Sequence, residues 1–287
     1  MRRTVPIAAG FAMVLASMSL VQYASFTREK LYDLGDFDSA LWNTVHGRFL
    51  WSDPYASRLT SRHLYLTLPL LAPLYAMLPR PWLLLATQAL VIAATIPLLG
   101  SGASPAARAA TIALFVVHPA VSNLAALDVH PDVVAIPLLV LLWRALRSGT
   151  ARWSVAWTAA VVLSKEDFAL TTAALAVAFL PRRASRKAAL AALGTSLAWI
   201  GIAFGLWLPA ASPSGGVWQL SRYARWGSGA AAVMTAPFRE PEPCSRTSPI
   251  GIASRTSRVS WARSCPRSRR PRASPSCPGS SSPSCPR

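Results

Sequence analysis

Long runs of apolar residues alternate with short polar stretches over the first 238 of the 287 residues in this chain. A helix needs about 20 consecutive apolar residues to cross a membrane. Seven runs of 12 to 24 residues are expected to cross, the shortest with support from neighbouring helices, at 5–26, 81–100, 108–125, 133–147, 153–164, 168–181 and 188–211. The pattern therefore predicts an all-α, polytopic bundle of transmembrane helices over residues 1–238.

Two runs allow more than one interpretation. Residues 5–26 follow Arg2 and Arg3, as a cleaved signal peptide would, but the length of the run and the apolar runs after it favour a first transmembrane helix. Residues 64–78 form an eighth apolar block, which Pro69 and Pro73 interrupt. We expect this block to stay at the outer face or to dip into the membrane without crossing it.

Basic residues favour the cytoplasmic side of a membrane. They flank the runs at 2–3, 108, 144–152 and 182–187, so the polar stretches 27–63, 128–132 and 165–167 are expected outside. Three apolar blocks lie between the first two of these stretches, and the odd number is why block 64–78 should not cross. The charges at 165–167 then mark an outer turn between two short helices. One long helix with central charges is the alternative, at a cost of several kcal/mol unless the charges are paired.

Composition supports a membrane protein and sets the last 49 residues apart. The chain is 53% hydrophobic and 14% charged, whereas soluble domains carry about 25% charged residues. Residues 239–287 hold 13 Ser, 10 Arg, 9 Pro and all four cysteines, so we expect a disordered tail. Three interpretations compete for it: out-of-frame translation of GC-rich DNA, a plain disordered tail, and a basic arm. Nucleic acid is not expected as a partner, although the net charge is +18, because many basic residues flank spans or lie in this tail.

Three polar clusters are expected on the outer face. The first carries Asp33, Asp36 and Asp38, the second is 128–132, and the third is 165–167. A carboxylate beside a hydroxyl can act as a general base, and a basic side chain can hold a phosphate. The structural alternatives are solvated loop acids, a helix cap at Asp38, and pairing of Lys165 with its acidic neighbours. Convergence of the clusters on one face is what favours a functional site.

Other signals are weaker. Tryptophan and tyrosine side chains near the ends of the apolar runs are interpreted as interfacial anchors, and they include Tyr65, Tyr75, Trp143 and Trp153. His118 and Pro119 are interpreted as a helix end. No phosphate-binding glycine loop, dinucleotide fingerprint or zinc-protease motif is found.

Four motifs, taken together, resemble a known family. They are Tyr32-Asp-Leu-Gly-Asp-Phe-Asp-Ser-Ala-Leu-Trp-Asn-Thr-Val-His-Gly-Arg48, Asp128-Val-His-Pro-Asp132, Lys165-Glu-Asp167 and Arg222-Tyr-Ala-Arg-Trp-Gly227. Their order and spacing are similar to those of the predicted bacterial membrane proteins grouped as domain of unknown function 2079. The resemblance covers about residues 5–238. Members of that family run further with more helices, so the departure after Phe238 agrees with an out-of-frame tail.

The layout of that family is similar to the C-type superfamily of membrane glycosyltransferases, which use sugars linked to polyprenyl phosphate. The resemblance implies Asp33 or Asp38 as the catalytic base, with Asp36 as an extra acid. It further implies a substrate- and phosphate-binding set comprising Lys165, Glu166, Asp167, His130, Asp132 and Arg222. Lys165 and Arg222 would hold the phosphate, while His130 and Asp132 could line the acceptor site or a divalent metal; the cofactor is otherwise open.

Three functions follow from these inferences. The first is a glycosyltransferase in the bacterial plasma membrane, acting at the outer face on a polyprenyl-phosphate-linked sugar, with membrane lipids as its surroundings. The second is a transporter or flippase, which would place charges near the bilayer midplane. The third is an inactive, truncated remnant.

Overall fold

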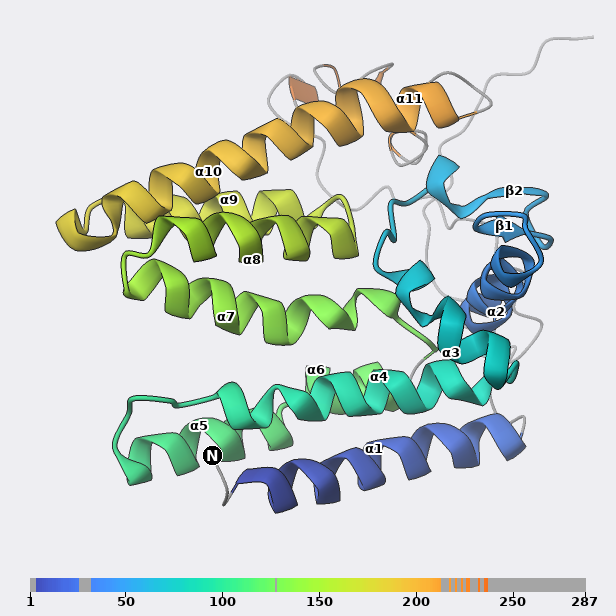
Figure 1. Cartoon of the computed structure of the whole chain (residues 1–287), viewed down its shortest axis with the longest axis horizontal. Coiled ribbons are helices and arrows are strands. Elements are labelled where there is room, and N and C mark those ends of the chain that lie inside the picture. The colour runs from blue at the N-terminus through green and yellow to red at the C-terminus, as the bar shows by residue number, and fades with distance from the viewer. Residues whose placement is uncertain are drawn as a thin grey trace, which may run out of the picture. The chain divides into compact units, whose positions relative to one another are not determined.

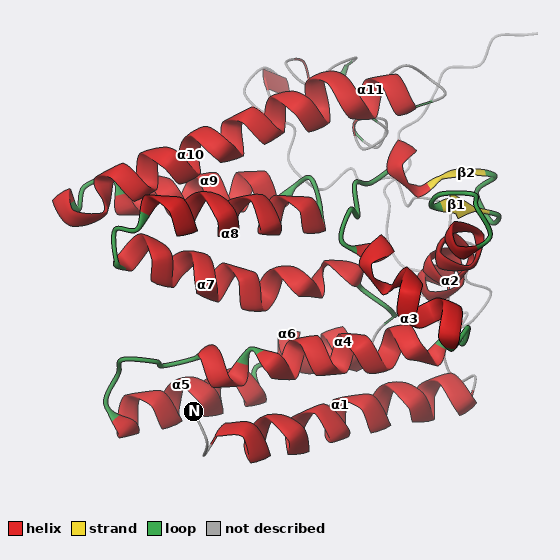
Figure 2. Ribbon diagram, viewed as in Figure 1, coloured by secondary structure: helices red, strands yellow, loops and turns green. Residues whose placement is uncertain are grey.

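A computed structural model describes residues 4–25, 32–126 and 128–212, together with isolated positions at 217, 220, 223, 226–227, 232 and 235–236. Its elements are almost entirely helical (Figure 2), and the two short strands of the described part, β1 (Trp51–Ser52) and β2 (Ser57–Arg58), pair antiparallel. The tail 239–287 and Arg222 lie outside the described residues.

The described residues form α-helices of very different lengths. They are α1 (Val5–Ser25), α2 (Tyr32–Val45), α3 (Ala72–Met77), α4 (Trp82–Ala94), α5 (Pro105–Val117), α6 (Pro119–Ala126), α7 (Ala135–Arg147), α8 (Ala151–Ser164), α9 (Phe168–Phe179), α10 (Arg186–Ile200) and α11 (Leu208–Ala211). Short turns of tighter helix are η2 (Leu59–Ser61), η3 (Leu68–Leu71), η4 (Ile96–Leu98), η5 (Pro131–Val134) and η6 (Arg183–Ser185), and a π-helical stretch, η7 (Gly201–Trp207), joins α10 to α11.

The helices pack in two groups. Helix α1 packs along α4 and α6, while α7, α8, α9 and α10 pack on one another, and α4 contacts α7 between the groups. Helices α2 and α3 and the strand pair lie together at one end of these helices (Figure 1), where α2 packs on α3 and β1. The connections at that end carry the polar motifs.

Polarity is distributed as expected for a protein in lipid. Small polar side chains are buried between helices: Thr172 on α9 and Ser196 on α10 are both fully buried, and their hydroxyl oxygens lie 2.7 Å apart. Large apolar side chains instead point outward from α1, α4, α5, α9 and α10, among them Met13, Leu90, Leu114, Leu170 and Leu197. A hydrocarbon solvent favours this arrangement, because exposed apolar groups then face a medium of their own kind.

Two helical stretches are long and apolar enough to cross a membrane, at 5–25 and 183–211. The shorter apolar helices include 68–77, 82–98, 105–117 and 168–179. The number of crossings, seven by the sequence pattern, stays a prediction.

Three expectations about individual segments can be compared with the structure. Residues 165–167 do separate two helices, α8 and α9, as the favoured interpretation had it. Block 64–78 holds only η3 and α3, ten helical residues that extend about 15 Å, half of a hydrocarbon core, and α3 packs on α2. The run 108–125, in contrast, was expected to be one crossing, and the structure has two helices, α5 and α6.

Pro119 explains the break in that run. The ring of a proline disfavours helical geometry at the residue before it, and His118 is accordingly extended, with φ −66° and ψ 124°. Pro119 then begins α6, at a position where a missing N–H costs nothing.

Gly149 follows the C-terminal end of α7 and provides a test of how that end packs. It ends the helix with φ +70°, and an added Cβ would collide with the backbone carbonyl oxygen of Ala184. Gly47 has φ +86° with open space around it. We predict that Gly149→Ala lowers the free energy of unfolding by at least about 2 kcal/mol, whereas Gly47→Ala costs only about 1 kcal/mol of backbone strain.

Thermal unfolding of the two variants in the same detergent checks this prediction. An equal loss for both variants would show that the turn after α7 does not pack against Ala184 as described.

Candidate functional site

A carboxylate from a distant turn caps the N-terminus of α2. The Asp128 side chain accepts hydrogen bonds from the backbone N–H groups of Asp33 and Leu34, at 2.8 and 3.0 Å. These N–H groups lie in the first turn, where no helical partner exists, and a negative charge there is favourable. Asp128 is only 8% exposed, so the second motif fixes the start of the first.

Asp36 makes a second buried link. It is 4% exposed, and both of its carboxylate oxygens lie 3.1 Å from one guanidinium nitrogen of Arg62. Ser52, on β1, also donates to it, and the Arg62 guanidinium lies over the Tyr55 ring at 3.4 Å from its centroid. The acid that the family comparison left as extra is therefore the most buried of the three acids on α2.

Glu166 anchors the chain after η2 onto the α8–α9 turn. One oxygen accepts from His63 Nδ1 and the other from the backbone N–H of Leu64, both at 2.8 Å. Leu66 N–H donates to Leu163, at the end of α8. Burial alone would raise the pKa of Glu166, but His63 and the backbone N–H groups outweigh it and hold that pKa below its ordinary value.

Lys165 is paired with two acids from either side. Its Nζ lies 3.4 Å from Asp132 on η5 and 3.5 Å from Asp167 in its own turn. Burial lowers the pKa of Lys165, but the two carboxylates reverse this effect and raise it. Burial raises the pKa of Asp167 despite the lysine, with Glu166 adding to the rise.

Tyr65 lies at the meeting point of the motifs. Its ring packs edge-on against Phe37 of α2, with centroids 5.2 Å apart, and lies 5.9 Å from Lys165 Nζ. Burial raises the pKa of its phenol, and the negative charges of four acids from all three motifs add to this, namely Asp132, Glu166, Asp167 and Asp33. Tyr65 and Tyr75 were interpreted as interfacial anchors, but both are buried in the core beside α2.

Asp33 points to the same region. Asp33 is largely exposed. Partial burial of its carboxyl and the neighbouring charge of Asp128 raise its pKa, while the charge of His130 lowers it. His130 is held by its backbone N–H, which donates to Gln88 Oε1 at 2.6 Å, while the Gln88 amide donates to Leu124 at 2.7 Å. Thus Gln88 of α4 fixes the backbone of His130.

Asp38 has a different environment. Its carboxylate accepts from the Tyr75 hydroxyl of α3 at 2.5 Å, and burial raises its pKa. It lies five residues after Asp33, which turns it about 140° around the helix. The structure therefore separates the two candidate bases.

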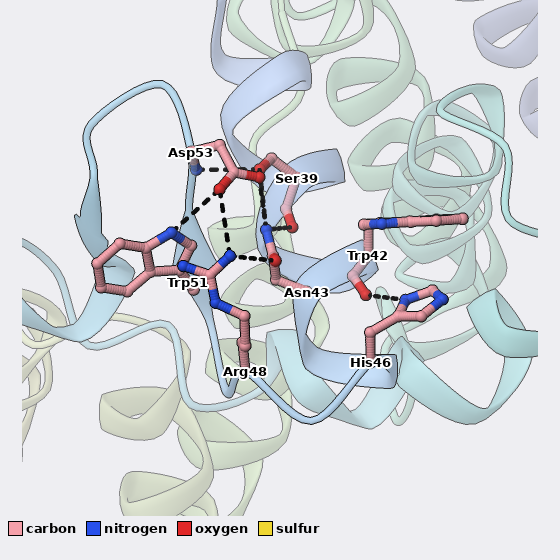
Figure 3. Close-up of polar contacts among 7 residues, drawn as sticks. All are labelled: Ser39, Trp42, Asn43, His46, Arg48, Trp51 and Asp53. Carbon is pink, nitrogen blue, oxygen red and sulfur yellow. Dashed lines mark hydrogen bonds and ion pairs between the residues drawn. The ribbon is translucent and has the colours of Figure 1, made fainter.

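A further face of α2 holds the strand pair (Figure 3). Asp53 accepts from the side chains of Ser39, Asn43 and Trp51, at 3.0, 2.8 and 3.0 Å. These hydrogen bonds lower the pKa of Asp53, the one from Asn43 most, and Arg48 also contributes from 3.6 Å. Asp53 is a structural acid that fastens β1 to α2.

The sequence-predicted residues are thus partly united. Asp33 with His130, and Lys165 with Asp132, Glu166 and Asp167, gather around Tyr65 at one end of the helices. Asp38 is bound to Tyr75 instead. The sequence interpretation did not place Arg62, His63 or Gln88 at the site, and it interpreted Tyr65 as an interfacial anchor. Arg62 and His63 precede block 64–78, and Gln88 is a polar residue inside the run 81–100.

No metal-binding set is found in the described part of the chain, because no three His, Cys, Asp or Glu side chains gather as ligands would. The acids here are partnered by Lys165, Arg62, His63 and backbone N–H groups instead. We assign no residue to a metal.

The pKa values of Glu166 and Asp167 shift in opposite directions, so the two carboxyls should contribute differently to stability. A carboxyl whose pKa is lowered on folding stabilises the fold above its unfolded pKa of 4.5 and loses that contribution as pH falls through the folded value. Glu166→Gln should therefore lower stability at pH 7 by about 1–3 kcal/mol, with a smaller deficit at pH 4. Asp167→Asn should not lower it, since the pKa of Asp167 is raised above 3.8.

Thermal unfolding of both variants at pH 7 and pH 4 checks this. If Asp167→Asn loses as much stability as Glu166→Gln at pH 7, the buried contacts of Glu166 with His63 and Leu64 do not stabilise the fold as described.

Comparison with known proteins gives one match. A family model described as predicted membrane protein, DUF2079, matches residues 28–242. This range includes all four motifs and the residues that gather around Tyr65. No curated protein and no solved structure matches the chain. Because the match covers most of the chain and the helices turn apolar side chains outward, the chain belongs to the DUF2079 family of predicted membrane proteins.

Proposed function

We propose that the cluster around Tyr65 is the active site of a glycosyltransferase that takes a sugar from a polyprenyl-phosphate donor at the outer face of the bacterial plasma membrane. The observation that carries the proposal is the meeting of Asp33, His130, Lys165 and Asp132 at one end of the helices. Convergence of several polar groups is typical of a binding site.

Asp33 is the base in this proposal. It is exposed, so an acceptor hydroxyl can reach it, and its pKa is raised by burial and by Asp128. A raised pKa makes a carboxylate a stronger base at neutral pH. The acceptor proton moves to Asp33, the acceptor oxygen bonds to the anomeric carbon, and the bond from that carbon to the phosphate oxygen breaks.

Lys165 receives the departing phosphate. Its charge is shared between Asp132 and Asp167, and Asp167 is the more exposed partner, at 52% against 21%. The raised pKa of Asp167 makes its negative charge the easier of the two to displace. A phosphate oxygen can then replace it on the ammonium group, which stabilises the negative charge that develops as the bond breaks.

Matched substitutions on α2 test the base. Asp33→Asn should reduce transfer by about 10²–10⁴-fold and leave membrane insertion unchanged. Asp38→Asn makes the same chemical change five residues away and should keep most of the activity, because Asp38 is bound to Tyr75.

The assay uses purified full chain in proteoliposomes, a radiolabelled polyprenyl-phosphate hexose, and an envelope fraction as the acceptor source; label leaving the lipid donor is measured. Full transfer by Asp33→Asn would remove that residue from the mechanism. Loss in Asp38→Asn alone would assign the base to Asp38.

The phosphate contact has its own signature. Lys165→Gln should raise KM for the labelled donor by about tenfold or more, since hydrogen bonds to charged groups contribute about 1.5–3 kcal/mol. Lys187→Gln is the control, because that lysine lies at the start of α10 among basic residues. An unchanged KM in Lys165→Gln would place the phosphate elsewhere.

Transport is a second candidate, favoured by the excess of acids. In the described residues, the acids at this end of the helices include Asp33, Asp36, Asp128, Asp132, Glu166 and Asp167, while the basic side chains that form ion pairs with them are Arg62, His63 and Lys165. Such an excess of acids suits cation or proton coupling. Uptake of a labelled solute by the same proteoliposomes, with no covalent product, would favour transport over transfer.

A further inference from the structure

Charge is divided between the two ends of the helices. Every acid in the described residues belongs to α2, to the strand pair, or to the turns at 128–132 and 165–167, and none occurs in residues 133–164 or 168–212. The opposite ends of α7, α8, α9 and α10 carry arginines instead. Gly149 and Ala184 touch across the turns there, so these ends lie together.

A cavity of about 590 Å³ opens at this basic end. Its walls come from the loop between η4 and α5, from Thr111 on α5 and from the last two turns of α7, and they include Leu99, Val140, Trp143, Arg144 and Arg147. One side of the cavity is therefore apolar and the other cationic. The volume falls in the range of small-ligand sites, about 300–1,000 Å³.

The two arginines of this cavity lack acidic partners. In the described part of the chain, no carboxylate lies within ion-pair distance of Arg144 or Arg147. The Arg147 guanidinium lies 4.7 Å from the centroid of the Trp143 ring, which holds it in place. Arginines are also favoured at the C-terminus of a helix because of its dipole. That preference alone does not account for a cavity with an apolar wall beside Arg144 and Arg147.

We propose that this cavity binds the phosphate headgroup of an anionic phospholipid, with the acyl chains along Leu99, Leu139 and Val140. Arg144 and Arg147 are one turn apart, so both can reach the same headgroup. Arginine donates to phosphate oxygens in a paired geometry, and basic pockets between membrane helices suit anionic headgroups. The apolar wall favours a lipid over a free phosphate ion. This inference does not depend on the proposed function.

Binding is measured by native mass spectrometry of the purified full chain with dioleoyl phosphatidylglycerol and, at equal chain length, dioleoyl phosphatidylcholine. The wild type should bind phosphatidylglycerol at least about tenfold more tightly. Arg144→Gln with Arg147→Gln should weaken binding of phosphatidylglycerol roughly 25-fold, about fivefold for each arginine. Arg144→Lys with Arg147→Lys should retain most of the preference and guards against a general folding defect.

The matched control is Arg182→Gln with Arg183→Gln, which removes two charges from the same end but outside the cavity. It should leave phosphatidylglycerol binding within about twofold of wild type. Equal affinity for the two lipids, equal losses in both double glutamine variants, or displacement of phosphatidylglycerol by 10 mM inorganic phosphate would each overturn the proposal.

Discussion

The carboxylate of Asp128 closes the first turn of α2 from a position 94 residues further along the chain. A buried carboxylate is costly unless hydrogen bonds satisfy it, so this contact cannot shift without exposing α2 N–H groups and a charge together. Glu166 repeats the device on the Leu64 backbone, and Asp36 does so with Arg62. Asp128 and Glu166 hold the segment 32–78 against the ends of the longer helices, and Asp36 with Arg62 ties two parts of that segment together. These contacts help to bring Asp33, His130 and Lys165 to the same end of the helices.

The membrane explains why so few contacts suffice. In lipid, apolar burial between helices contributes little, and packing of small residues with polar contacts holds helices together. The buried Thr172–Ser196 pair joins α9 to α10 in this way. The described carboxylates lie on α2, in the strand pair and in the turns at 128–132 and 165–167, at one end of the longer helices. The described acids lie at one end, together with Arg48, Arg62 and Lys165, whereas the opposite ends of α7 to α10 carry arginines and no acid, so the two ends differ chemically.

Apolar run length was enough to predict a mostly helical chain. The α8–α9 turn was predicted from the placement of the basic residues, and the expectation that 64–78 does not cross came from the odd number of blocks and from Pro69 and Pro73. Run length alone carried the span 108–125 across Pro119, although His118 and Pro119 were interpreted as a helix end, and the structure confirms that end. Spacing could not separate Asp33 from Asp38, since both lie on α2 and their difference arises from Tyr75, on another helix. Likewise, the position of Tyr65 in the sequence is typical of an interfacial anchor, and its contacts with Phe37 and Lys165 come from distant parts of the chain. Long-range partners of this kind leave no local pattern.

The shared location of the motifs can be tested directly by thiol labelling of intact cells. All four cysteines lie in 239–287, so replacing them by serine gives a background in which single cysteines can be introduced at Asp33, His130, Lys165 and Arg144. A membrane-impermeant maleimide should label the first three positions from outside and position 144 only after permeabilisation. Labelling of position 33 from outside, with positions 130 and 165 reached only from inside, would contradict the account.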